Sequence, residues 1–386
     1  MLTTLAVANY RSLRDLVLPM GRLNVVTGAN GSGKSNLYRA LRLLSETAQG
    51  GVVPALAREG GLQSTLWAGP ETISARMRRG EVPIQGGPRT APVSLRLGFA
   101  GDDYGYAIDL GLPEPSLSRF AHDPQIKREV IWSGPFLRQS NVLLDRRGPM
   151  ARVRAGRGWR VAAEHVSLFE SVFAQLADPQ AAPEVLSLRE TIRGWRFYDH
   201  FRSDLQAPAR QPQLGTRTPV LSHDGRDLAA AWQTIVEIGD ARALAAAVDD
   251  AFPGTRVAVV GDGDRFALEF SQHGLLRPLS AAELSDGTLR YLLWIAALHT
   301  PRPPPLMVLN EPETSLHPDL LPALARLIAH GARSTQVWVV SHASRLIAAL
   351  EAQADCNSIH LEKQFSQTGI VGQGMLDAPA WYWPER

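Results

Sequence analysis

One octapeptide, Gly-Ala-Asn-Gly-Ser-Gly-Lys-Ser at residues 28–35, constrains the fold of this chain more than any other feature. It follows a short apolar run, residues 23–27, and precedes Leu37, Leu41 and Leu44, whose spacing is that of one helix face. A strand, a glycine loop and a helix are therefore predicted in succession, which is the context that a GxxxxGK[ST] phosphate-binding loop requires. The alternative is a glycine-rich turn that binds nothing, which fits poorly with a chain that has only three lysines.

The chemistry of this loop suits a nucleoside triphosphate. Glycines allow backbone N–H groups to point at the phosphates, and the helix N-terminus adds a favourable dipole. Lys34 is expected to reach the outer phosphates, and the Ser35 hydroxyl is expected to bind Mg²⁺. ATP and Mg²⁺ are the predicted cofactors. The candidate nucleotide-binding residues here are Gly28, Asn30, Gly31, Ser32, Gly33, Lys34, Ser35 and Asn36.

Two further apolar runs, residues 306–309 and 337–340, each end in polar residues and precede a helix-like segment. Such continuous runs are typical of strands buried on both faces of a parallel sheet. Residues 93–99 and 104–110 instead alternate within a stretch rich in glycine and proline, which indicates antiparallel β structure. The predicted fold class is α/β, a nucleotide-binding head with a mixed or parallel central sheet, an antiparallel β subdomain and an inserted helical lid.

Helical patterns are predicted over residues 168–176, 185–201 and 228–252, and residues 257–270 are predicted to form a hairpin that turns at 261–264. We find no internal repeat and no sustained heptads. Three segments are predicted from these patterns: residues 1–135, the first part of the head with the β subdomain; residues 136–252, an inserted arginine-rich hairpin and helical lid; and residues 253–386, the second part of the head.

The polar residues after the two late apolar runs are expected at one edge of the sheet, because ligands of open α/β sheets bind at the carboxyl ends of strands. Asn310 and Glu311 follow the first run, and His342 follows the second. Glu311 is the candidate general base, unless it is only a solvated loop acid. His342 is either a ligand-facing residue or a structural histidine. Lys34 and Glu311 are predicted catalytic residues.

The pentapeptide Leu-Ser-Asp-Gly-Thr at residues 284–288 precedes an apolar helix predicted over residues 289–298. The first amides of this helix and the Ser285 side chain suit either a helix cap or a bound terminal phosphate. Taken alone, the pattern is more often a simple cap.

Taken in order, GANGSGKS, LSDGT, NEPETSLHP and SH resemble the phosphate loop, the signature, the Walker B strand with its D-loop, and the switch histidine of ABC-type P-loop ATPases. The resemblance is to RecF-, SMC- and OLD-like proteins, particularly the predicted bacterial AAA-family ATPases in which EPETSLHP follows the Walker B strand. It covers about residues 1–50 and 275–350. Residues 9–12, Asn-Tyr-Arg-Ser, also resemble the first strand of that group.

The resemblance implies a homodimer with ATP between two heads, which hydrolysis would release. Ser285 and Gly287 would be phosphate-binding residues that reach the nucleotide held by the other copy. His342 would sense or stabilise the γ-phosphate, which makes it the third predicted catalytic residue. Asn310 stands where the pattern usually has aspartate, so Mg²⁺ is expected to be held more weakly and turnover to be slow. Asp286 is a second departure from the pattern, and no effect is predicted for it.

The metal ligands predicted in this way are Ser35, Asn310 and Gln63. Gln63 is the predicted counterpart of the Q-loop glutamine, with an ordinary loop glutamine as the alternative. The long stretch between Lys34 and Ser285 disfavours the compact cassette of a transporter and is too short for the coiled coil of an SMC protein. A RecF-like head is predicted, with no Toprim nuclease domain after His342.

Composition predicts a soluble cytoplasmic protein without a membrane partner. The single cysteine, Cys356, excludes an intramolecular disulfide and a Cys-based zinc site. The first twenty residues carry Arg11, Arg14 and Asp15 inside what would have to be the apolar part of a signal peptide. No apolar run approaches the length of a membrane span.

An arginine-rich stripe at residues 138–160 is a candidate DNA contact, because it carries seven arginines against Asp145. Aromatic residues lie nearby and are candidates for base stacking: Trp195, Phe197, Tyr198 and Phe201. The alternatives are a solvated hairpin for the arginines and an amphipathic core helix for the aromatic residues. The arginines predicted to contact DNA are Arg146, Arg147, Arg152, Arg154, Arg157 and Arg160.

Two functions follow from these observations. The first is a Mg²⁺-dependent ATPase that dimerises on ATP and acts with DNA in repair, genome maintenance or anti-phage defence. The second is a nucleotide-dependent switch whose head dimer controls a protein effector without acting on DNA. Stimulation of ATP hydrolysis by DNA would separate the two. A transporter motor is disfavoured by the motif spacing.

Overall fold

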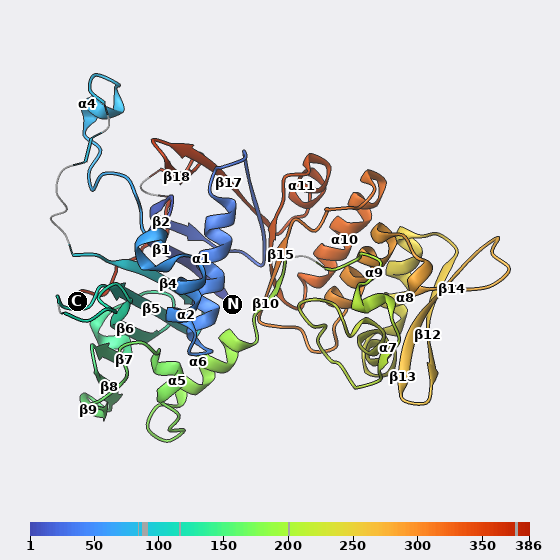
Figure 1. The fold of residues 1–386 in the computed structure, drawn as a ribbon, viewed down its shortest axis with the longest axis horizontal. Helices are drawn as coiled ribbons and strands as arrows, with labels where there is room; N and C mark the ends of the chain where they lie inside the picture. The colour runs from blue at the N-terminus through green and yellow to red at the C-terminus, as the bar shows by residue number, and fades with distance from the viewer. Residues whose placement is uncertain (84, 87–91, 116, 200, 375–376) are drawn as a thin grey trace. The chain divides into compact units, whose positions relative to one another are not determined.

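The computed structural model describes residues 1–83, 85–86, 92–115, 117–199, 201–374 and 377–386, and Figure 1 follows the chain through them. The chain forms two compact units. Unit 1 consists of Met1–Met20, Gly28–Gly194 and Ile359–Arg386, and unit 2 consists of Gly21–Thr27 and Trp195–Ser358. The three segments predicted from the sequence are a different division of the chain and stay a prediction.

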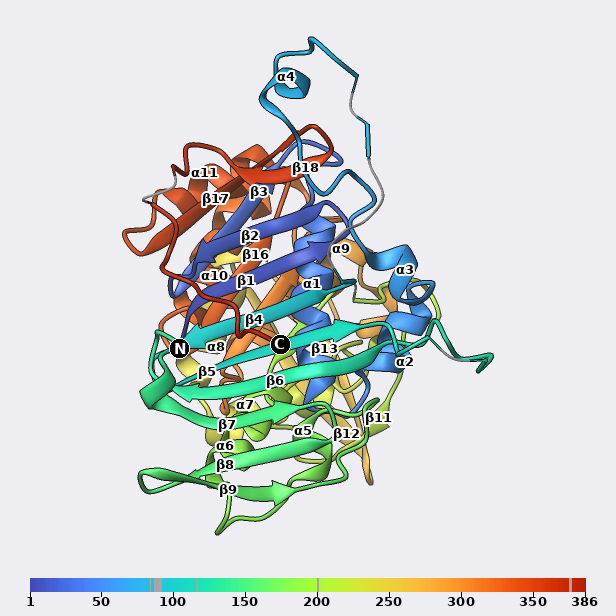
Figure 2. The same ribbon diagram turned by 90° about the vertical axis from the view of Figure 1, so that its left-hand side faces the viewer.

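Unit 1 is built on an eight-stranded antiparallel sheet with the order β2-β1-β4-β5-β6-β7-β8-β9, which Figure 2 shows from one face. The antiparallel pairing of β4 with β5 confirms the β structure predicted at residues 93–99 and 104–110. The arginine-rich segment continues this sheet as its last three strands. The strands are β1 (Leu2–Tyr10), β2 (Leu13–Pro19), β4 (Leu95–Gly101), β5 (Tyr104–Gly111), β6 (Gln125–Ser133), β7 (Val142–Arg147), β8 (Met150–Ala155) and β9 (Gly158–Ala163).

Helix α1 (Lys34–Thr47) follows the phosphate loop, as the apolar spacing predicts. Leu37, Leu41 and Leu44 are fully buried on one face, and the helix packs on β1 and β4. The other helices of unit 1 are α2 (Val52–Arg58), α3 (Gly61–Thr65), α4 (Ala75–Arg78), α5 (Val172–Gln175) and α6 (Pro183–Arg193), with a 3-10 turn, η1 (Gln139–Asn141). Near the C-terminus, β17 (Cys356–Gln364) and β18 (Gln367–Ile370) form an antiparallel hairpin.

Unit 2 contains parallel strands in the order β10-β15-β16-β3. They are β10 (Arg196–Tyr198), β15 (Leu306–Asn310), β16 (Gln336–Val340) and β3 (Leu23–Gly28), whose last residue opens the phosphate loop in unit 1. The apolar residues of β15 and β16 are almost completely buried, which confirms the parallel strands predicted from their continuous apolar runs.

The helices of unit 2 enclose one apolar core, which contains Trp232, Trp294 and Leu324. They are α7 (Leu228–Ile238), α8 (Ala241–Ala251), α9 (Asp286–Leu298), α10 (Leu321–Gly331) and α11 (Ser344–Glu351), and the 3-10 turns are η2 (Pro208–Arg210), η3 (Ala281–Glu283) and η4 (Pro318–Leu320). The predicted hairpin is present as β12 (Thr255–Asp262) and β13 (Arg265–Gln272), with the short strands β11 (Gln213–Leu214) and β14 (Leu279–Ser280) beside β13.

Two helix predictions are corrected by the structure. The helix predicted over residues 185–201 ends at Arg193, and residues 196–198 form β10 instead. Phe197 and Tyr198 are buried in the parallel sheet, where aromatic side chains are favoured. The region predicted at 228–252 is two helices, because Asp240 caps α8 by accepting hydrogen bonds from two backbone N–H groups.

Of the described residues, none belongs to a helix that has both the length and the apolar character needed to span a membrane.

Candidate functional site

The phosphate loop has the backbone that its glycines predict. Gly28, Gly31 and Gly33 all have positive φ angles, 142°, 79° and 113°. A Cβ at Gly28 would clash with the carbonyl oxygen of Leu361, and one at Gly33 would clash with the Thr368 hydroxyl. Only glycine therefore fits at these two positions.

Lys34 and Ser32 lie inside this loop. The ammonium group of Lys34 donates to the carbonyl oxygens of Gly28 and Ala29, at 2.6 and 3.2 Å. The buried Ser32 Oγ has no hydrogen-bond partner among the described residues. Ser35 and Asn30 are exposed. A loop with bent glycines, an enclosed lysine and an unsatisfied hydroxyl fits a phosphate ligand.

The loop is braced by two residues of unit 1 for which no role is predicted from the sequence. Thr368 on β18 donates to the carbonyl oxygen of Ser32 at 2.7 Å, and its hydroxyl lies 2.7 Å from that of Ser12. Asn36, a predicted nucleotide-binding residue, donates to Ser12 Oγ at 2.8 Å. Ser12 carries a signal in the Asn-Tyr-Arg-Ser stretch, whereas Thr368 carries none.

In unit 2, Glu311 and His342 follow two parallel neighbours, β15 and β16, as predicted. Glu311 Oε1 lies 3.7 Å from His342 Nδ1, and both side chains are about half exposed. The backbone of Glu311 has a φ of 49°, which is uncommon for a residue with a side chain. Asn310 is the last residue of β15 and is partly buried. A small movement of either side chain would therefore bring Glu311 and His342 within hydrogen-bond distance.

Glu313 is a third member of this cluster, and the sequence assigned it no role. Its Oε1 accepts hydrogen bonds from the Ser341 hydroxyl and from the backbone N–H groups of His342 and Ala343, at 2.6, 3.0 and 3.2 Å. The same oxygen lies 3.7 Å from His342 Nδ1. Its Oε2 is buried without a partner among the described residues. Glu313 thus fixes the backbone that carries the histidine.

Ser285 caps α9, so the capping interpretation of residues 284–288 is confirmed. Its hydroxyl accepts from the Thr288 N–H at 3.1 Å and remains exposed. Asp286 is paired with Arg210, and the Nη2–Oδ1 distance is 2.7 Å. A Cβ at Gly287 would lie 2.8 Å from the carbonyl oxygen of Ser315. A role for Ser285 and Gly287 in phosphate binding stays a prediction.

The helix face of α9 that begins at Gly287 is held to the loop after β15 by hydrogen bonds. Arg290 donates to the carbonyl oxygen of Thr314 at 2.9 Å, and Trp294 Nε1 donates to that of Pro312 at 3.0 Å. Residues three and four positions apart lie on one helix face. Helix α9 and the loop that carries Glu313 therefore form one packed body within unit 2.

Gln63 lies on the short helix α3 in unit 1 and is exposed. Its Nε2 is 3.2 Å from His122 Nδ1. Its role as a metal ligand stays a prediction.

The arginine-rich stripe divides into buried and exposed residues. Arg146 is fully buried and its Nη1 lies 2.6 Å from Glu129 Oε2, so the prediction that it contacts DNA is wrong. Arg147 and Arg152 pair with Asp145. The five other arginines of this prediction are exposed or partly exposed, so the DNA hypothesis stays open. Arg154 contacts backbone oxygens and the Trp159 ring, and Arg160 donates to the carbonyl oxygen of Ala181.

The aromatic residues proposed for base stacking belong to the interior of unit 2. Their side chains are buried, and Tyr198 and Phe201 pack against Trp294 with ring centroids 6.2 and 4.7 Å apart. They cannot stack on a nucleic acid in this fold, so that prediction is wrong. The alternative of core residues is correct, although Phe197 and Tyr198 lie on a strand rather than a helix.

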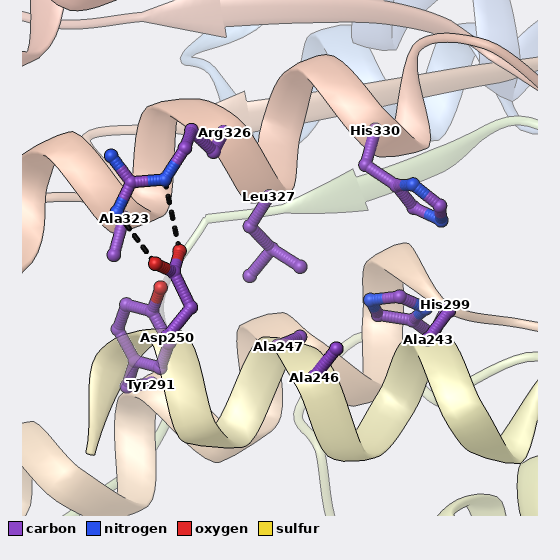
Figure 3. Close-up of a pocket in the computed structure, with 10 residues that line it drawn as sticks. All are labelled: Ala243, Ala246, Ala247, Asp250, Tyr291, His299, Ala323, Arg326, Leu327 and His330. Atoms are coloured by element: carbon purple, nitrogen blue, oxygen red, sulfur yellow. Dashed lines mark hydrogen bonds and ion pairs between the residues drawn. The ribbon is translucent and has the colours of Figure 1, made fainter. Parts of the chain in front are cut away.

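A separate cavity of about 330 Å³ lies between α8, α9 and α10 in unit 2, and Figure 3 shows its lining. At one end, the rings of His299 and His330 stack with centroids 4.7 Å apart. At the other end, Arg326 donates to both carboxylate oxygens of Asp250. Burial, and then His330, lower the pKa of His299 to about 4. None of the predicted nucleotide-binding residues lines this cavity, so it is distinct from the candidate site.

Residues 23–348 match the model of a protein family described as "AAA domain, putative AbiEii toxin, Type IV TA system". No curated protein sequence matches the chain.

Among solved structures, the chain is similar to an SMC head bound to the C-winged helix domain of ScpA. The TM-score is 0.51, with 12% sequence identity over 97% of this chain and 98% of that chain. It is also similar to the SMC head domain from Thermotoga maritima, with a TM-score of 0.50 and 12% identity over 97% of this chain and 99% of that chain. At this identity, the likeness shows the fold alone, an α/β head with a large antiparallel sheet.

Proposed function

The chain belongs to this AAA family of P-loop ATPases, and from that premise we propose that it binds ATP with Mg²⁺ and hydrolyses it slowly as an ATP-dependent homodimer. The phosphate loop would hold the nucleotide of its own chain. The signature residues of the second copy would complete the site. Hydrolysis would then separate the two heads.

The order of the parallel strands carries this proposal. β3, β16 and β15 are successive neighbours, and Val340 lies opposite both Val26 and Asn310 in the register. The phosphate loop continues β3, and the segments with His342 and Glu311 continue the other two strands. Parallel neighbours end at one edge of a sheet, where ligands of α/β folds bind. This order supports a shared role for Lys34, Glu311 and His342.

Each residue would have a defined task. Lys34 and the backbone N–H groups of the loop would neutralise the outer phosphates, and Ser35 would hold Mg²⁺. Asn310 and Gln63 are the further ligands proposed for the metal, which when bound would offset the phosphate charge. Because Asn310 is neutral, the metal would be held more weakly than by aspartate and turnover would be slow.

Glu311 would accept the proton of the attacking water, and His342 would contact the γ-phosphate. Their half-exposed side chains lie 3.7 Å apart, which supports action of both residues at one place. Glu313 would act as a positioning residue, because it fixes the backbone of His342 without lying on the exposed side of the cluster.

The dimer proposal rests on the exposed start of α9. Ser285 and Gly287 lie at the N-terminus of a 13-residue helix, where an anion is favoured by free N–H groups and the helix dipole. In the proposed dimer, these residues would approach the γ-phosphate of the ATP bound by the other copy.

Replacement of Lys34 and of Glu311 tests the proposal. Lys34→Ala is expected to weaken ATP binding, whereas Glu311→Gln is expected to keep ATP binding and lose roughly 10²- to 10⁴-fold in hydrolysis. Equilibrium binding of a fluorescent ATP analogue and single-turnover phosphate release measure the two effects. A Glu311→Gln protein that hydrolyses at the unmutated rate would remove Glu311 from the role of base.

Two biological roles follow for a cytoplasmic ATPase of this kind. The first is action with DNA in repair, genome maintenance or anti-phage defence, through the exposed and partly exposed arginines of residues 147–160. The second is control of a protein effector, and the toxin–antitoxin system named in the family description favours it. Acceleration of ATP hydrolysis by duplex DNA at low salt would support the first role, and its absence would favour the second.

A further inference from the structure

The signature segment, residues 284–288, contains an acid where the proposed function brings a phosphate. Asp286 is 59% exposed and directly follows Ser285. A carboxylate so close to a γ-phosphate repels it, and this repulsion would weaken an ATP-bridged dimer. The acid therefore needs a counter-charge for the segment to accept an anion.

Arg210 supplies that counter-charge from a segment far away in the sequence. It is the last residue of η2, its side chain is only 3% exposed, and its Nη2 lies 2.7 Å from Asp286 Oδ1. Its Nε and Nη2 also donate to the carbonyl oxygen of Ser203. Nη1 donates to three carbonyl oxygens just before Ser285, those of Ala281, Ala282 and Leu284.

A second buried arginine lies one helical turn beyond Asp286. Arg290 donates through Nη2 to the carbonyl oxygen of Phe201 at 3.0 Å and to Ser203 Oγ at 3.3 Å. Burial lowers the pKa of Arg290, and the charge of Asp286 opposes that effect. The start of α9 thus carries two guanidinium groups against one carboxylate, a net charge of about +1 beside the positive end of the helix dipole.

We propose that Arg210 is the positioning residue of the signature segment. It neutralises Asp286 and fixes the backbone before Ser285, so that the segment accepts the terminal phosphate of an ATP held by a second copy of this chain. Asp286 in turn offsets one of the two positive charges at the start of α9, which limits the attraction for the phosphate, so that the dimer can open after hydrolysis. This inference rests on the proposed ATP-bridged dimer and deepens it.

A set of charge variants in the Glu311→Gln protein tests the proposal. The dimer dissociation constant is measured with ATP and Mg²⁺ by analytical ultracentrifugation at low and high salt. Asp286→Asn is expected to tighten the dimer, and Arg210→Met is expected to weaken it, each by roughly three- to tenfold at low salt. The double variant Arg210→Met/Asp286→Asn has the parental net charge and is expected to return near the parental value.

The double variant separates electrostatic from purely structural support. If Arg210 only held the backbone, removing Asp286 would not rescue Arg210→Met, and Asp286→Asn alone would leave the dimer unchanged. That pair of results would overturn the proposal. Arg210→Lys, which keeps the charge, is expected to lie closer to the parent than Arg210→Met does.

Two controls keep the outcome interpretable. If Arg210→Met does not fold, the Asp286→Asn variant alone still tests the proposal. A dimer of that variant that is as weak as the parental dimer, or weaker, at low salt contradicts the proposal. ATP binding to the monomer is expected to be the same in all variants, because the phosphate loop is untouched. If the Glu311→Gln parent does not dimerise with ATP, the proposed function fails before the role of Arg210 is tested.

Discussion

Arg146 in unit 1 and Arg210 in unit 2 are both buried arginines with one carboxylate partner, but the partners differ. Glu129, the partner of Arg146, is as completely buried as the arginine itself. Asp286, the partner of Arg210, is mostly exposed. In the Arg146–Glu129 pair, both charged groups are buried inside the protein. In the Arg210–Asp286 pair, the carboxylate is accessible to a prospective ligand. The location of the counter-charge, rather than the burial of the arginine, distinguishes a structural role from a functional one.

The largest expected effect is the loss of the buried charge in unit 1. Glu129 accepts hydrogen bonds from Arg146, Tyr106, Ser171 and the Val172 N–H. In a glutamine at this position, the amide NH₂ group would point at hydrogen-bond donors and could not accept from them. Glu129→Gln is expected to destabilise the protein by about 3–5 kcal/mol, because an uncompensated charge remains buried. The midpoint of urea unfolding, followed by circular dichroism, measures this change.

The contrast between the two arginine pairs would be wrong if Glu129→Gln lowered the free energy of unfolding by less than about 1 kcal/mol, because that is the range of exposed ion pairs. Arg152→Gln serves as the matched control in the same sheet, because its partner Asp145 is also bound by Arg128 and Arg147 and Arg152 itself is partly exposed.

The second effect concerns His299, a partly buried titratable group in the cavity of unit 2. The pKa of His299 is lowered to about 4 by burial and by His330, and the nearby Asp240 acts in the opposite direction. As the pH falls, His299 takes up its proton at a higher pH in the unfolded chain than in the folded protein. The contribution of neutral His299 to the free energy of unfolding is therefore expected to be complete above about pH 6.5 and to fall by up to about 3 kcal/mol as the pH approaches 4. Urea midpoints across this range measure the loss.

His299→Gln is the control for this prediction and is expected to remove that part of the acid sensitivity. Equal pH slopes in the two proteins would show that another group is responsible.

A smaller effect is expected for the acid-to-amide change in unit 2. Asp286→Asn is predicted to lower the stability by at most about 1 kcal/mol, because its side chain is mostly in solvent and an amide oxygen can still accept from Arg210. The same urea experiment applies. A loss as large as that of Glu129→Gln would make Asp286 a structural residue and would erase the contrast between the two pairs.

The smallest effect on stability is expected at an exposed arginine. Arg157 is exposed and forms no ion pair within the part of the chain that the structure describes. Arg157→Ala is expected to leave the urea midpoint unchanged. If DNA is a partner, the salt dependence of duplex binding is expected to decrease by about one phosphate contact. An unchanged salt slope would exclude Arg157 from the contact.

The parts of the fold that the sequence predicts are those with local signals. The strand, loop and helix around Lys34 are contiguous, and the hairpin at 257–270 alternates in one stretch. The positions of Glu311 and His342 after buried strands are predicted for the same reason, since each lies just beyond an apolar run, whereas their roles stay a prediction.

The parts that sequence reasoning misses depend on contacts between distant residues. Thr368 donates a hydrogen bond to Ser32, which is 336 positions away in the sequence, and Arg210 donates one to Asp286, which is 76 positions away. Arg146 and Arg157 look alike in the stripe, but of the two only Arg146 lies opposite a buried carboxylate on the neighbouring strand. Which face of a strand becomes the core is decided by tertiary packing, and an arginine count carries no information about it.

The most direct test of the central claim is the mass of the Glu311→Gln protein in solution, with and without ATP and Mg²⁺, at several protein concentrations. Light scattering coupled to size-exclusion chromatography is the measurement. The account predicts a monomer without nucleotide and a dimer with ATP and Mg²⁺. A monomer that demonstrably holds ATP would contradict it, because the site would then be complete within one chain and Ser285 would have no phosphate to bind.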